Sequence, residues 1–152
     1  MSVRRPYIDK TNPEIYKAMV NASEESKKAS REAGLSLALI ELVNTRVSQI
    51  NGCVTCLSIH AAYARNEGVS QLKLDVLPAW RDATIYSEEE RTALLLAESL
   101  TTINHSEDRD MTIKFAKEFF TEEQVVAIEW AVILIGAFNR ISIASGHPAI
   151  RK

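Results

Sequence analysis

Hydrophobic residues recur at helical spacing along nearly the whole chain. Spacings of three and four residues place apolar side chains on one face of an α-helix, and they dominate from about residue 13 to residue 144. The two-residue alternation of half-buried strands, a hairpin turn between β-branched strands and an internal repeat are not found in the sequence. The sequence therefore predicts an all-α fold of about seven helices.

Capping residues indicate where these helices begin and end. Ser87 and Thr121 each stand three residues before Glu or Gln, the pattern of a capping box. Glycines mark helix ends at Gly34, Gly68 and Gly146. The predicted helices run from Pro13 toward Gly34, from Leu37 to Ile50, from about Cys53 to Asn66, from Ser70 to before Pro78, from Ser87 to about Leu100, from Asp110 to Phe120 and from Thr121 to about Ala144. No low-complexity linker separates them, so we expect a single domain over residues 1–152.

Composition and charge narrow the function classes. Hydrophobic content of 46% and charged content of 25% are ordinary for a soluble globular protein, and a net charge of −2 gives no electrostatic case for nucleic acid. The N-terminus has no apolar run behind its arginines, so it is not a secretory signal. The most apolar stretch, Val125–Phe138, is short for a bilayer span and contains Glu129. We expect a cytoplasmic protein without a membrane or nucleic-acid partner.

The candidate chemistry lies in the stretch NGCVTCLSIH, which holds both cysteines of the chain, Cys53 and Cys56. In a reducing compartment a C-x-x-C pair is more often catalytic or metal-binding than a structural disulfide. A helix that begins near Cys53 presents unsatisfied N–H groups, which favour thiolate over thiol. That effect is only about 0.3–1 kcal/mol, so a further activating group is needed.

His60 and Glu41 can supply that activation. His60 follows Cys56 by four residues, so the two share one helix face. Glu41 is the only charge among residues 35–44, and a buried lone carboxylate needs a partner. If the two helices form a hairpin at Asn51-Gly52, Glu41 lies about 13.5 Å from this turn along one helix and His60 lies about 12 Å from it along the other. The two side chains are then at nearly the same level. We therefore predict a Glu41–His60 hydrogen bond and a carboxylate–imidazole–thiol relay.

Other polar residues carry weaker predictions. Glu129 lies within an apolar helix and could pair with Arg140 or with a neighbouring subunit. Arg46, His105 and His147 are expected at the surface or in loops.

Eleven residues separate Glu41 from Cys53, two separate Cys53 from Cys56, and three separate Cys56 from His60. This spacing resembles the motif of the alkylhydroperoxidase D-like (AhpD-like) branch of the carboxymuconolactone decarboxylase superfamily. The stretches YSEEERTALLLAESLT and AFNRISIASG resemble later helices of that family, so the similarity extends from about residue 37 to residue 146.

The resemblance implies a helical homotrimer or homohexamer that acts as a thiol-dependent peroxidase or disulfide reductase without a bound cofactor. Cys53 and Cys56 would be the redox pair, and Glu41 and His60 would be the proton relay. A hydroperoxide or disulfide would be the substrate, and a dithiol or lipoyl-type protein would be the reductant. Thr55 stands where peroxidase members often carry a second histidine. Lactone decarboxylation is not expected, because members with that activity generally lack the C-x-x-C.

The residues leave the order of attack open. Cys56 has the histidine and is favoured as the relay-coupled nucleophile, whereas Cys53 has the helix N-terminus and is expected to be the more exposed, partner-facing thiol.

Three rival interpretations also remain. Cys53, Cys56, His60 and Glu41 could bind structural zinc, although the ligands crowd one helix. A thioredoxin-like fold would need a strand before the C-x-x-C. The chain could also be a helical interaction protein with inert cysteines.

Overall fold

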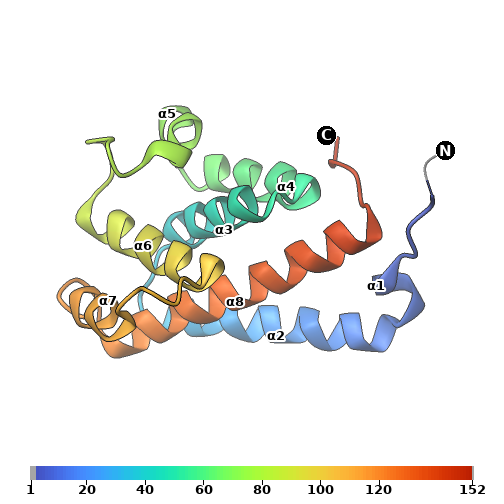
Figure 1. The fold of residues 1–152 in the computed structure, drawn as a ribbon, viewed down its shortest axis with the longest axis horizontal. Coiled ribbons are helices and arrows are strands. Elements are labelled where there is room, and N and C mark those ends of the chain that lie inside the picture. The colour runs from blue at the N-terminus through green and yellow to red at the C-terminus, as the bar shows by residue number, and fades with distance from the viewer. Residues whose placement is uncertain (1–2, 152) are drawn as a thin grey trace.

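The computed structural model describes residues 3–151 and, within them, contains helices and no strands (Figure 1). The elements are α1 (Ile8–Thr11), α2 (Pro13–Glu32), α3 (Leu37–Asn51), α4 (Val54–Asn66), α5 (Gln71–Asp75), the 3₁₀ turn η1 (Leu77–Ala79), α6 (Glu88–Thr102), α7 (Arg109–Ala116) and α8 (Glu122–Ser145). The predicted all-α fold is confirmed. The sequence did not predict α1, a single turn too short to carry a periodic pattern, or η1, a 3₁₀ turn that contains the Pro78 expected to end a helix.

Helix α3 lies at the centre of the fold and packs against α4, α6 and α8. All residues from Leu39 to Ser48 except Arg46 are buried, as expected for a helix that packs on several sides. Leu42, Val43 and Val47 are completely buried there. Burial of each such side chain contributes about 1.5–3 kcal/mol, so the position of α3 is strongly fixed.

Helix α8 is the second core element and lies against α2, α3 and α6 (Figure 1). By length and composition alone this 24-residue helix could cross a membrane. In the fold it contributes Ile128, Val132 and Ile135 to the hydrophobic core, as a buried helix of a globular domain does. The predicted helix from Thr121 to about Ala144 is confirmed, with Thr121 as its N-cap and Ser145 as its last residue.

The helix caps predicted at Ser87 and Thr121 are present. Ser87 and Thr121 each form a complete capping box, with Glu90 and Gln124 respectively. Gly52 ends α3 with a left-handed φ of 67°, a conformation that glycine adopts without a Cβ penalty. The chain reverses there, and Cys53 becomes the N-cap of α4. This turn makes α3 and α4 the hairpin on which the site is built.

Glu129 does not pair with Arg140. Arg140 instead donates from Nη1 to the carbonyl of Gly136, one turn earlier on α8 (2.8 Å). Burial raises the pKa of the Glu129 carboxyl above its ordinary value. The sequence-based pairing is wrong because eleven residues of helix separate the two side chains by about 16 Å.

Candidate redox site

Cys53 and Cys56 are joined by a disulfide at the beginning of α4. Their Cα atoms are 5.4 Å apart, and the Cys53 sulfur also accepts a hydrogen bond from the Cys56 backbone N–H at 3.3 Å. Cys53 therefore caps the helix with its sulfur, as Ser or Asp does with oxygen. The unsatisfied N–H groups of this first turn favour negative charge on sulfur when the pair is reduced.

The Glu41 and His60 side chains meet across the α3–α4 hairpin. Glu41 Oε2 lies 2.6 Å from His60 Nδ1, and the two side chains are 10% and 19% exposed. Asn44 donates to the other carboxylate oxygen at 3.5 Å. When Nδ1 donates to the carboxylate, Nε2 of a neutral ring is left as the acceptor, which is the tautomer a general base requires. The predicted hydrogen bond is present.

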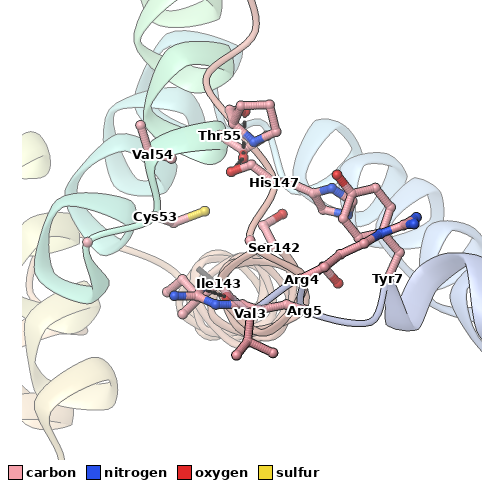
Figure 2. Close-up of a pocket in the computed structure, with 14 residues that line it drawn as sticks. Val3, Arg4, Arg5, Tyr7, Cys53, Val54, Thr55, Ser142, Ile143 and His147 are labelled. Atoms are coloured by element: carbon pink, nitrogen blue, oxygen red, sulfur yellow. Dashed lines mark hydrogen bonds between the residues drawn. The ribbon is translucent and has the colours of Figure 1, made fainter. Parts of the chain in front are cut away.

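Cys53 and the Glu41–His60 pair line two separate hollows. The first, here called the Cys53 cleft, has a volume of about 720 Å³ and lies between the start of α4, the end of α8 and the N-terminal segment. Figure 2 shows the Cys53 sulfur directed into this cleft. The second, the His60 cavity, has a volume of about 110 Å³ and is lined by Glu41, His60, Asn44 and the buried hydroxyl of Ser30. The two hollows share no lining residue.

Both cysteines are buried, with 1% of Cys53 and 4% of Cys56 exposed. The prediction that Cys53 would be the more exposed thiol is wrong. Its sulfur turns back over the first turn of α4 to accept the Cys56 N–H, and both residues belong to the main core cluster. Cys53 nevertheless borders the cleft, whereas Cys56 lines neither hollow.

The Thr55 side chain holds the C-terminal segment. Its hydroxyl is 2.8 Å from the carbonyl of His147 and 2.9 Å from that of Pro148, and it donates its single proton to this pair. The His147 ring lies 2.9 Å from Asp9 Oδ1 and packs edge-on against Tyr7. His147 is thus in a loop, as predicted, but its side chain is tied down and lines the Cys53 cleft.

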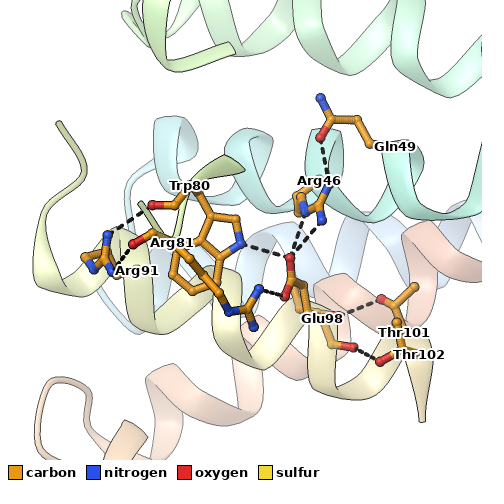
Figure 3. A network of polar contacts seen from close by, with 9 residues as sticks. Arg46, Gln49, Trp80, Arg81, Arg91, Glu98, Thr101 and Thr102 are labelled. Carbon is orange, nitrogen blue, oxygen red and sulfur yellow. Dashed lines mark hydrogen bonds and ion pairs between the residues drawn. The ribbon is translucent and has the colours of Figure 1, made fainter. Parts of the chain in front are cut away.

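A second polar cluster, which the sequence did not reveal, surrounds Glu98 on α6 (Figure 3). Oε1 accepts from Arg46 Nε at 3.0 Å, from Arg46 Nη2 at 2.8 Å and from Trp80 Nε1 at 2.8 Å. Arg81 pairs with Oε2. Burial alone would raise the pKa of Glu98, but hydrogen bonds from Trp80, Arg81 and Arg46 and the charge of Arg81 outweigh it and hold that pKa below its ordinary value.

This Glu98 cluster corrects the prediction that Arg46 is a surface residue. The Arg46 side chain is only 15% exposed and links α3 to α6. One signal in the sequence could have indicated this ion pair. Arg46 is the only basic residue in the largely buried helix α3, and a buried cation requires a buried anion.

In this structure the four motif residues are not arranged as a zinc centre. The two sulfurs are bonded to each other, and Glu41 is hydrogen-bonded to His60. Over residues 3–151, no group of three or more His, Cys, Asp or Glu side chains is arranged to hold a metal ion.

Comparison with known proteins agrees with the fold and the motif. The profile of the carboxymuconolactone decarboxylase family matches residues 13–99. An uncharacterised protein of Bacillus subtilis (strain 168), YdfG, is 35% identical over 152 residues, covering 100% of both chains. The chain belongs to the carboxymuconolactone decarboxylase family.

Solved structures share the fold of this chain. A protein of unknown function from Agrobacterium tumefaciens, with a suggested assignment as the antioxidant defence protein AhpD, has a TM-score of 0.87 at 27% identity, over 99% of this chain and 100% of its own. The debrominase Bmp8 has the same fold at 20% identity, with a TM-score of 0.78 over 92% of this chain and 73% of its own. The expected likeness to the AhpD-like branch is confirmed.

Proposed function

We propose that the protein is a thiol oxidoreductase that reduces a hydroperoxide or a disulfide and forms the Cys53–Cys56 disulfide in doing so. The observation that carries the proposal is the bonded pair of sulfurs at a helix N-terminus, with Cys53 at the border of a cleft and a Glu41–His60 pair further along the same hairpin. The similarity to the Agrobacterium protein with a suggested antioxidant role supports the same chemistry.

The proposed peroxide reaction begins with the Cys56 thiol, one helical turn before His60. His60 takes the thiol proton while Glu41 holds the ring in position. The thiolate attacks the terminal peroxide oxygen, the O–O bond breaks, and the leaving alkoxide takes a proton to give an alcohol. Cys53 then attacks the sulfenic acid on Cys56, and water leaves as the disulfide forms.

The reductant completes the cycle through Cys53. A dithiol or lipoyl-type partner attacks the disulfide, forms a mixed disulfide with Cys53 and then closes its own disulfide, returning both protein thiols. Cys53 suits this role because it is the sulfur that lines the cleft.

We also propose that the protein is cytoplasmic and forms a homotrimer or homohexamer. On α8 the side chains of Val126, Trp130 and Ile133 are 45%, 53% and 50% exposed, and their spacing places them on one face of the helix. A contiguous exposed apolar face of this kind is typical of subunit contacts.

Thiol counting tests the redox proposal directly. Fully reduced protein mixed with a small excess of hydroperoxide is expected to lose two thiols per chain while consuming one peroxide. Dithiothreitol should restore both thiols. A thiol count that peroxide and small disulfides leave unchanged would favour the alternative of a helical interaction protein with inert cysteines.

His60→Ala is expected to slow thiol alkylation and peroxide consumption at pH 7 about 10²-fold, because a positioned general base contributes about 10²–10⁴-fold. Glu41→Gln should cause a smaller loss, about tenfold, since the ring keeps its place but loses its anionic partner. The measurement is the rate of iodoacetamide alkylation as a function of pH.

The pH profile separates a lost base from a damaged fold. If His60 acts as the base, the variant recovers its rate in alkaline solution, where the thiol ionises without help. An unchanged rate at pH 7 in His60→Ala would contradict the relay. Tyr63→Phe is the matched control, because its ring contacts the His60 ring edge-on and its side chain is half exposed.

A further inference from the structure

The Cys53 cleft has an unbalanced charge. Its lining includes Arg4 and Arg5 and, among the residues that the structure describes, no Asp or Glu. A smaller hollow that shares both arginines adds Lys10. The chain as a whole has a net charge of −2, so this concentration of positive charge departs from the average surface.

The neighbouring acid, Asp9, forms no ion pair with either arginine. Asp9, on α1, is held by His147 at 2.9 Å. Arg5 donates from Nη1 to the carbonyl of Ile143 at 2.7 Å, which fixes its side chain at the end of α8. The Arg4 guanidinium lies 5.9 Å from the Tyr7 ring centroid. No described carboxylate is within ion-pair distance of either arginine.

We infer that the Cys53 cleft binds a carboxylate on the small dithiol that reduces the Cys53–Cys56 disulfide. This inference rests on the proposed function and specifies its reductant. The cleft volume of about 720 Å³ falls in the range of small-molecule sites rather than of flat protein interfaces. Arg4 supplies the attraction, and Arg5 holds the N-terminal segment against α8 so that Arg4 stands over the cleft.

The exchange itself balances without a further reactant. One thiolate of the dithiol bonds to the Cys53 sulfur, and Cys56 leaves as thiolate and takes a proton. The second thiol of the reductant then displaces Cys53, so two protein thiols and one cyclic disulfide result. The carboxylate takes no part in bond making and acts only through binding.

The test compares dihydrolipoate with dihydrolipoamide, which carry the same dithiol and differ in a distant carboxylate. We expect the oxidised wild-type protein to be reduced about three- to tenfold faster by dihydrolipoate at low salt, since a pair of unit charges 4 Å apart in water is worth about fivefold in an equilibrium. In Arg4→Gln the ratio of the dihydrolipoate rate to the dihydrolipoamide rate should be near one. Arg31→Gln, which removes an exposed charge at the far end of α2, should leave the ratio unchanged.

Salt gives a second measurement on unmodified protein. Raising the ionic strength to about 1 M shortens the screening length to about 3 Å and should remove the preference without changing the dihydrolipoamide rate. Equal rates for the two dithiols in wild type at low salt would overturn the inference, as would a preference that survives in Arg4→Gln. Those results would leave the proposed function standing if dithiothreitol still reduces the disulfide. If no dithiol reduces it, the proposed function fails as well.

Discussion

Cys56→Ser is expected to abolish turnover of hydroperoxides and disulfides, with a loss of at least about 10³-fold. A serine hydroxyl is far less acidic and less nucleophilic than a thiol, so the step that breaks the O–O bond is lost. Cys53→Ser should abolish turnover equally, because the oxidised Cys56 then has no neighbouring thiol to resolve it. The measurement is steady-state consumption of hydroperoxide with dithiothreitol kept at low concentration.

Single-turnover experiments separate the two roles. Cys53→Ser should still consume one equivalent of peroxide and hold a sulfenic acid on Cys56, whereas Cys56→Ser should consume none. The reverse pattern would assign the attack to Cys53. Val54→Ala is the matched control, because this exposed side chain lies between the two cysteines on the first turn of α4. Steady-state turnover retained in either serine variant would contradict the dithiol mechanism.

Glu98→Ala is expected to lower the free energy of unfolding at pH 7 by about 3–5 kcal/mol, the usual cost of removing one partner from a buried ion pair. The loss leaves Arg46 without its anion between α3 and α6, and it leaves the buried Trp80 N–H without its acceptor. Urea unfolding followed by circular dichroism measures the change. Glu89→Ala, on an exposed face of the same helix, should change stability by no more than about 0.5 kcal/mol.

The stabilisation by Glu98 is expected to depend on pH. The pKa of Glu98 is lowered in the folded protein, so its contribution is fully present above the ordinary carboxyl pKa of 4.5 and is lost as the pH falls through the folded-state pKa. The difference in stability between wild type and Glu98→Ala should therefore narrow in acid. A difference that is constant down to pH 2, or a loss equal to that of Glu89→Ala, would show that the Glu98 cluster does not stabilise the fold in this way.

The sequence predicted the features that depend on nearby residues. Helix ends follow from local caps such as Ser87 and Thr121, whose partners are three residues away. The Glu41–His60 contact could be predicted because a tight turn at Gly52 fixes the register of two consecutive helices. In both cases a short stretch of regular backbone determines the distance, so counting residues is sufficient.

Features that join distant parts of the chain were missed. Arg46 and Glu98 are 52 residues apart, and no helical period connects them. The contact of His147 with Asp9 spans 138 residues. The burial of Cys53 depends on its packing in the main core cluster, with residues from other helices such as Ile128 of α8. Tertiary contacts decide all three, and a local pattern does not identify the partner: Arg46 alone could indicate a buried anion, but not that this anion is Glu98.

The separation of the Cys53 cleft from the His60 cavity has a consequence for engineering the protein. Because the two hollows share no lining residue, a reductant that binds in the Cys53 cleft and a proton that passes through the His60 cavity would reach the hairpin by different routes. Substitutions around Arg4 can then retune which reductant is accepted without disturbing acid–base behaviour. Changes around Ser30 and Asn44 can do the converse, so selectivity and pH optimum become independently adjustable.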